Sequence, residues 1–240
     1  MDAQVVNIPL QNLAIALVPA LLVVYVLMKW SLNAKNALYA LGRMMAQLLL
    51  VGYVLTFIFA SDSPIIVFVV LAVMIGISSW IALGVIKEDK LALYRYSLLA
   101  VMMGGMIMFV IVMVMVLDID PWYKAQFSIP IAGMIFANSM NSVALALERL
   151  TVELSRGVEY LQARTIALQT SMIPVINSLF AVGLVSLPGM MTGQILSGVS
   201  PLIASRYQIM IMLMIFASSG ITTILFLKYS KTFFTNKYEQ

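Results

Sequence analysis

The sequence predicts an all-α polytopic membrane protein with about seven transmembrane helices, oriented N-out and C-in. Hydrophobic residues make up 62% of the 240 residues and charged residues only 10%, whereas a soluble domain has about 25% charged residues. No polar stretch is long enough for a second folded unit, so we expect a single membrane domain over residues 1–240. The first apolar run is long enough to span and no basic region precedes it, so no cleavable signal is expected.

Seven apolar segments are long enough to cross a hydrocarbon core about 30 Å thick. Lys and Arg favour the cytoplasmic side of membrane proteins. With the N-terminus outside, twelve of the fourteen Lys and Arg residues fall inside, and only Lys124 and Arg206 fall outside. This split predicts the orientation. The expected spans lie near residues 8–28, 38–60, 64–86, 97–117, 128–147, 171–194 and 207–227.

Several kinds of chemistry are excluded by composition. Cysteine and histidine are absent, so the chain can build no disulfide, no Cys or His nucleophile and no imidazole relay. No GxxxxGKS/T phosphate loop occurs, so we expect no ATP site and no catalytic residues in this chain. The formal charge of +4 follows the predicted membrane orientation and does not indicate a nucleic acid partner.

The segment GLVSLPGMMTGQILSG at 183–198 interrupts the sixth expected span with glycine, proline and small polar residues. Irregular backbone at bilayer depth is tolerated only where protein or a water-filled cavity satisfies its polar groups. A break at Pro188 and Gly189 therefore predicts a transport pathway, with freed carbonyls, Thr192 and Gln194 as oxygen ligands for a hard cation. The alternative is that the segment only bends the helix for packing.

Four polar side chains accompany this break. Asn138 and Asn141 lie in the fifth expected span, while Asn177 and Ser178 lie early in the sixth, after Pro174. Such residues commonly hydrogen-bond between membrane helices, so structural and pathway roles both stay open. The nineteen methionines are typical of flexible packing residues, and no metal ligand set is assigned.

Residues 138–169 predict a helix that extends span five into the cytoplasm. Apolar residues recur at steps of three and four, and Arg149 and Glu153 have the i,i+4 spacing that supports a helix. Gly157 is the expected break. The segment near 148–169 either packs on a neighbouring span or docks a soluble partner. The candidate docking residues are Glu148, Leu150, Glu153, Leu154, Arg156 and Glu159.

Three blocks resemble the iron-export ABC transporter permease family (FetB-type), which includes the plant aluminium-sensitive-three type proteins. They are LGRMMAQLLLVGYVLTFIF at 41–59, IPIAGMIFANSMNSVALALERL at 129–150, and IPVINSLFAVGLVSLPGMMTGQILSGVSPLIASRYQIMIML at 173–213. The ending FFTNKY at 233–238 resembles the plant branch. Two departures stand out: Asn177 replaces an Asp of the family, and the loop after Glu159 is about fifteen residues shorter.

The resemblance implies a permease subunit of an ABC-type exporter in the cell (inner) membrane, serving iron or other metal efflux and metal tolerance. It implies a homodimer of permeases paired with a separate ATP-binding cassette ATPase, so that ATP binds the partner and no cofactor binds this chain. The segment 148–169 would be the ATPase coupling segment. A stand-alone transporter or channel without an ATPase partner is the alternative.

Overall fold

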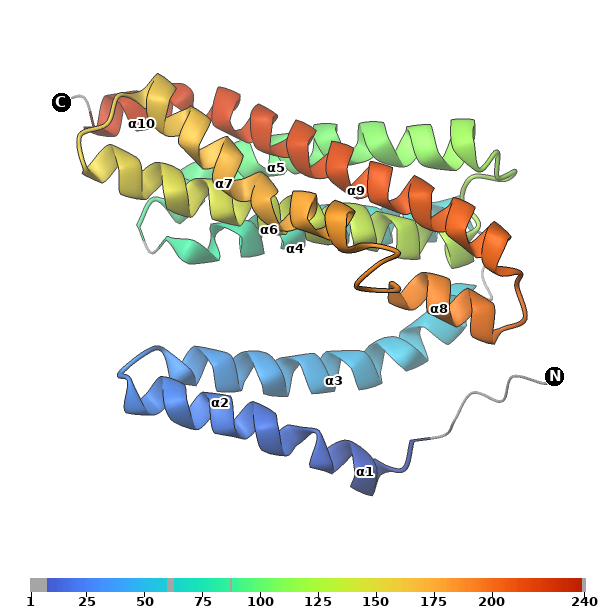
Figure 1. Cartoon of the computed structure of the whole chain (residues 1–240). Coiled ribbons are helices and arrows are strands. Elements are labelled where there is room, and N and C mark those ends of the chain that lie inside the picture. The colour runs from blue at the N-terminus through green and yellow to red at the C-terminus, as the bar shows by residue number, and fades with distance from the viewer. Residues whose placement is uncertain (1–7, 60–62, 87, 239–240) are drawn as a thin grey trace. The chain divides into compact units, whose positions relative to one another are not determined.

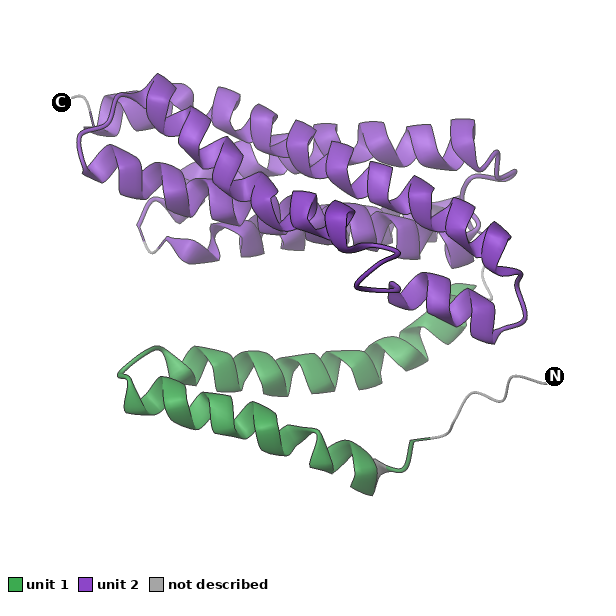
Figure 2. Ribbon diagram, viewed as in Figure 1, with its two compact units in different colours: residues 1–61 green, residues 62–240 purple. Residues whose placement is uncertain are grey.

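The computed structural model of the chain describes residues 8–59, 63–86 and 88–238. These residues form helices joined by short connections, and no β-strand occurs among them (Figure 1). They divide into two compact units, residues 1–61 and 62–240 (Figure 2). The single permease domain expected over 1–240 stays a prediction.

Unit 1 is a helical hairpin of α1 (Leu10–Ile15), α2 (Leu17–Lys29) and α3 (Ala34–Phe59). Ser31, with φ +57°, lies in the turn between α2 and α3. Among the described residues of this unit only Val24 and Ala34 are buried. The apolar side chains of α2 and α3 therefore face outward, as lipid-facing side chains do.

Unit 2 is a bundle in which α6 contacts α4, α5, α7 and α9 (Figure 1). A 3-10 turn, Leu83–Val85, follows α4, and a π-helical segment, Ile111–Val116, continues α5. The helices are α4 (Pro64–Ala82), α5 (Lys90–Val110), α6 (Ala125–Ser155), α7 (Tyr160–Ala181), α8 (Gly189–Leu196), α9 (Pro201–Tyr229) and α10 (Lys231–Tyr238).

Small residues allow the helices of unit 2 to approach closely, as is usual in membranes. A Cβ added at Gly104 of α5 would lie 2.4 Å from Thr222 Oγ1 and 2.9 Å from the Thr222 Cα on α9. One added at Gly105 would lie 2.6 Å from Phe136 Cε1 on α6. Ser139 on α6 accepts a hydrogen bond from Thr222 at 3.2 Å. Glycine and hydroxyl residues thus set the α5, α6 and α9 contacts.

Six helices of the described chain are long and apolar enough to cross a membrane. This confirms an all-α polytopic membrane protein. The expected span 171–194 is not one helix, because α7 and α8 divide it and α7 carries polar residues along its length. The count of seven and the N-out orientation stay predictions. Lys87, one of the twelve Lys and Arg residues counted for the orientation, lies outside the described residues. The six candidates are Gln11–Lys29, Ala34–Phe59, Pro64–Val85, Lys90–Val116, Ala125–Ser155 and Pro201–Tyr229.

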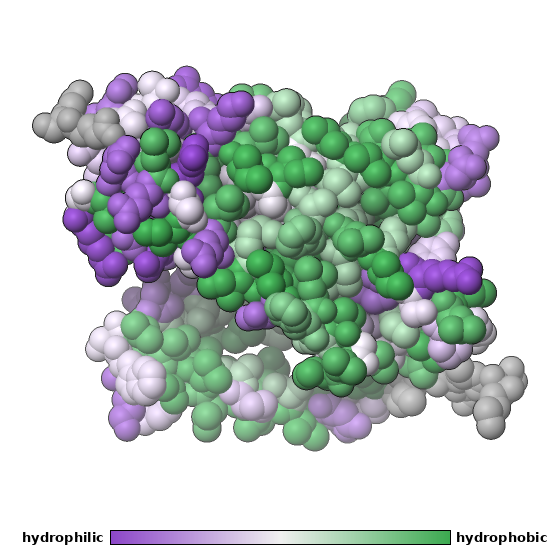
Figure 3. Space-filling view, turned by 45° about the horizontal axis from the view of Figure 1, so that its top comes forward, coloured by the Kyte–Doolittle hydropathy of each residue, from purple (hydrophilic) through white to green (hydrophobic). Residues whose placement is uncertain are grey.

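One end of unit 2 carries α10 and the α6–α7 turn, and polar side chains gather there (Figure 3). Lys237 of α10 forms an ion pair with Asp89 at 2.5 Å, and this hydrogen bond raises the pKa of Lys237. The Tyr160 hydroxyl donates to the Leu227 carbonyl, and burial raises the pKa of Tyr160 to about 12. These contacts join α10 to the start of α5, and α7 to α9, at the predicted cytoplasmic end.

Candidate functional site

The predicted break in the sixth span is present. Helix α7 ends at Ala181, and residues 182–188 connect it to α8 without helical structure. The Ala181 carbonyl accepts hydrogen bonds from Val185 N at 2.8 Å and Ser186 N at 3.1 Å, and Gly183 N donates to the Ser186 carbonyl at 3.0 Å. These bonds satisfy part of the backbone polarity that the end of a helix exposes.

The residue that permits this turn is Gly183, whose φ is +84°. The sequence predicts the break at Pro188 and Gly189, and this is wrong for Gly189, which does not supply the conformational freedom. Gly189 is the first residue of α8, and no left-handed backbone is found there. Pro188 is the N-cap of α8, with φ −62° and ψ 148°, values that its ring favours. The turn is thus made by Gly183 and ended by Pro188.

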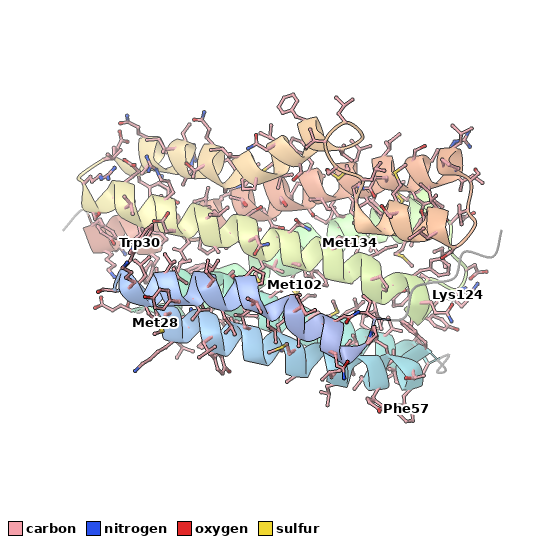
Figure 4. All side chains as sticks on the ribbon, turned by 60° about the horizontal axis from the view of Figure 1, so that its bottom comes forward. Met28, Trp30, Phe57, Met102, Lys124 and Met134 are labelled. Atoms are coloured by element: carbon pink, nitrogen blue, oxygen red, sulfur yellow. The ribbon has the colours of Figure 1, made fainter. Side chains whose placement is uncertain are left out.

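A cavity of about 470 Å³ lies beside the break, between α6, α7, α9 and the start of α8. Met134, labelled on α6 in Figure 4, belongs to its wall, whereas the labelled Lys124 lies just before the first residue of α6. The lining combines amide, hydroxyl, thioether and aliphatic side chains, and no ionisable residue is among the described lining residues. Its polar side chains are Asn138, Asn141, Ser142, Ser171, Ser178, Ser186 and Gln208.

Five of the eight predicted pathway residues line this cavity, which lies between α6, α7 and the break. Asn177, Thr192 and Gln194 do not line it. Asn177 neighbours Ser178 but is exposed on another face of α7. The five lining residues are Asn138, Asn141, Ser178, Pro188 and Gly189.

The two remaining predicted residues belong to α8. Thr192 donates its hydroxyl to the Pro188 carbonyl at 3.2 Å, which stabilises the first turn of α8. Gln194 lines a different cavity, of about 310 Å³, with residues of α6 and α9. Its Oε1 is buried and has no hydrogen-bond partner among the described residues.

Gln208 of α9 was missed by the sequence argument. Its side chain is only 5% exposed, it lines the main cavity, and its Oε1 has no partner among the described residues. Gln208 lies near the start of the expected span 207–227, and no role was assigned to it there. The available signal was an amide within the apolar run that follows Arg206.

The segment 148–169, which is predicted to be cytoplasmic, is helical on both sides of residues 156–159, and α6 ends at Ser155, two residues before Gly157 with φ +80°. The sequence left packing and docking open for this apolar stripe, and the structure shows packing for Leu150 and Leu154. Leu150 is 0% exposed and Leu154 is 7% exposed, and both belong to the core of unit 2. A partner protein therefore cannot contact them while this unit is folded.

Among the charged residues of the same segment, some are buried and others are exposed. Glu153 is buried and forms ion pairs with Arg149 at 2.6 Å and Arg156 at 3.5 Å. Glu148, Arg156 and Glu159 are exposed. Of the six predicted coupling residues, these three remain available to a partner.

The helices define a polytopic all-α membrane protein, and a cavity with both polar and apolar walls lies at a helix break. A family model described as "Uncharacterised protein family (UPF0014)" matches residues 10–234, and the chain belongs to this family.

Named relatives support the resemblance read from the sequence motifs. A UPF0014 membrane protein of Synechocystis sp. is 36% identical over 215 residues, covering 82% of this chain and 83% of the relative. The "Probable iron export permease protein FetB" of Escherichia coli is 31% identical over 254 residues, covering 97% and 95%. "Protein ALUMINUM SENSITIVE 3" of Arabidopsis thaliana is 29% identical over 227 residues, covering 88% and 82%. No solved structure matches the chain.

Proposed function

We propose that this chain is the membrane permease subunit of an ABC-type exporter in the cell (inner) membrane, with iron or another metal ion as its cargo. The observation that carries the proposal is the cavity of about 470 Å³ at the break between α7 and α8. Polar, irregular backbone beside a cavity is the arrangement that transporters use at their binding sites. The similarity to a protein named as an iron export permease supplies the cargo class.

Energy would come from a separate ATP-binding subunit, because this chain has no phosphate-binding loop. The surface for that partner is the end of unit 2 that carries the α6–α7 turn, with exposed Glu148, Arg156 and Glu159. Two permeases with two ATPases are the proposed assembly. ATP therefore binds the partner, and this chain acts as a transport subunit and not as an enzyme.

A stand-alone transporter or channel is the second candidate, and the shortness of the α6–α7 connection favours it. Only residues 156–159 separate the two helices. The alignment with the Escherichia coli relative covers 254 positions, more than the 240 residues of this chain. The relative therefore contains segments that this chain lacks, which leaves less protein for a coupling contact.

Reconstitution with the cognate ATPase separates the two candidates. The chain is placed in proteoliposomes with and without the ATP-binding subunit, and Fe²⁺ movement is followed by a metal-sensitive dye. We expect metal movement only with both ATPase and ATP. Movement that is equal without the ATPase would favour the stand-alone transporter. Absence of Fe²⁺ movement in every condition, with co-purified and active ATPase, would contradict an iron cargo.

A further inference from the structure

Three polar side chains of the cavity wall donate a hydrogen to backbone carbonyls of their own helices. Asn138 Nδ2 donates to the Met134 carbonyl at 2.8 Å, Ser178 Oγ to the Pro174 carbonyl at 2.9 Å, and Ser171 Oγ to the Leu168 carbonyl at 2.8 Å. A hydroxyl has one hydrogen, so each serine oxygen has only acceptor capacity left. The Asn138 Oδ1 likewise remains an acceptor. The walls formed by α6 and α7 thus offer acceptors to a guest.

Gln208 adds a further acceptor from α9. Its Oε1 is buried without a partner among the described residues, in a side chain that is 5% exposed. The residue lines both the main cavity and a smaller one of about 310 Å³ that borders Gly183. The terminal amide torsion of glutamine is broad, so Oε1 can turn toward a guest without a change of rotamer at χ1. A buried acceptor of this kind is destabilising until a donor reaches it.

Two helix ends also border the cavity, and their fields oppose each other. Ala181 ends α7, and Gly189 begins α8. A helix end carries about half an elementary charge, negative at the C-terminus and positive at the N-terminus. These contributions are of similar size and opposite sign. The side-chain acceptors therefore decide which guests are favoured, and they favour cations and hydrogen-bond donors.

A metal ion stripped of water does not suit these walls. No ionisable residue lines the cavity, and no cluster of three His, Cys, Asp or Glu residues occurs in the described chain. Sites for dehydrated divalent cations use carboxylates, whereas Mg²⁺ often keeps several waters. The six waters of an octahedral ion occupy about 180 Å³ at about 30 Å³ each, and a cavity of about 470 Å³ has room for them. The waters of such an ion point only donors outward.

We propose that the cavity binds a metal cation with its inner water shell intact, and that Gln208 is a specificity-determining residue for it. Shell waters donate to Gln208 Oε1, Asn138 Oδ1 and Ser178 Oγ, so that recognition depends on hydrogen bonds to the shell instead of bonds to the metal. This inference rests on the proposed metal cargo and states the form in which that cargo is held. It predicts selection by size and hydration, since no side chain supplies a charged ligand.

Hexaamminecobalt(III) tests this directly, because its ligands exchange too slowly to be stripped and present only N–H donors. It is added as an inhibitor of ATP-driven Fe²⁺ transport in proteoliposomes that contain the ATPase. Its binding to the purified chain is also measured by calorimetry. We expect inhibition and binding in the wild type. Gln208→Leu should weaken both about tenfold through the lost charge-assisted hydrogen bond. Gln169→Leu makes the same chemical change on an exposed residue of α7 outside the cavity and should leave them unchanged.

The two measurements separate this inference from the proposed function. If the chain transports Fe²⁺ but hexaamminecobalt(III) neither inhibits that transport nor binds the chain, recognition of the water shell is overturned and the metal cargo is retained. Equal binding by wild type and a folded Gln208→Leu chain would overturn the assignment of Gln208. If Fe²⁺ is not transported, binding that depends on Gln208 still supports the cation site, and absence of binding overturns it.

Discussion

Gly183 carries the sharpest prediction about the helix break. An added Cβ would meet no atom within 4 Å, so Gly183→Ala introduces no clash, yet φ is +84°. A left-handed backbone costs an L-residue about 1–2 kcal/mol. That free energy corresponds to roughly a 5- to 30-fold change in the ratio of two conformations. The substitution therefore disfavours the turn itself and not its packing.

Alanine at 183 instead favours continued helix beyond Ala181. Such a helix would lose the hydrogen bond from Gly183 N to the Ser186 carbonyl and would move the loop residue Val182 that lines the cavity. We expect transport by Gly183→Ala to fall by up to the same 5- to 30-fold factor. Insertion into the membrane should be retained, because no packed side chain is removed. The assay is ATP-driven metal transport in proteoliposomes, normalised to inserted protein.

Two matched alanine variants test the reasoning. Gly198→Ala imposes the same strain, at φ +89° and with open space around the Cβ, but Gly198 lies after α8 and does not line the cavity. Gly189→Ala places alanine in a helical position and should be nearly neutral. Transport by Gly183→Ala equal to wild type, or a loss equal to that of Gly198→Ala, would refute the role of this turn in the cavity.

Three further predictions concern packing, pH and orientation. Gly104→Ala forces α5 away from α9 and should lower the free energy of unfolding in detergent by about 1–3 kcal/mol. The control Gly220→Ala should not lower it, because its Cβ meets only Met172 side-chain atoms at 3.7 Å or more. Equal stability of the two variants would contradict the close contact. The pKa of Tyr160 is raised to about 12 from 10.0, so between these pH values the folded chain keeps a proton that the unfolded chain loses. The free energy of unfolding should therefore fall as pH rises from about 10 toward 12. The same dependence on pH in a Tyr160→Phe chain would exclude this cause. With the N-terminus outside, an impermeant thiol reagent should label Asp118→Cys and not Glu159→Cys in intact cells, since the native chain has no cysteine, and the reverse pattern would invert the orientation.

The sequence predicted the helical class, the break in the sixth span and the end of α6 near Gly157, because each depends on local composition. It did not distinguish Gly183 from Gly189, since both glycines flank the break and only the folded turn assigns the positive φ. The stripe through Leu150 and Leu154 was ambiguous for a related reason. An apolar helical face is equally required for packing inside a bundle and for docking a partner. Only the neighbouring helices decide between these uses.

The position of Gln208 depends on the same kind of information. Gln208 lies near the start of α9, where an amide could face either the membrane interface or a cavity. It faces the cavity because the break between α7 and α8 leaves space beside α9. A sequence window contains the amide and the break but not their separation in space. The position of Gln208 at the cavity therefore follows from the tertiary structure and not from the local sequence pattern.

Helix α6 provides a physical route between the proposed ATPase surface and the cavity. It is continuous over Ala125–Ser155, about 46 Å at about 1.5 Å per residue, and it carries both Asn141 at the cavity and exposed Glu148 about 10 Å further along. The ion pair of Arg149 with Glu153 at 2.6 Å, one helical turn apart, supports the helix next to Glu148. A rigid helix transmits displacement along its whole length, while the cavity wall opposite α6 belongs to α7 and α9. In the proposed exporter, ATPase motion that tilts α6 would therefore change the separation of the acceptors on α6 from Gln208 on α9, and with it the affinity of the cavity for its cargo.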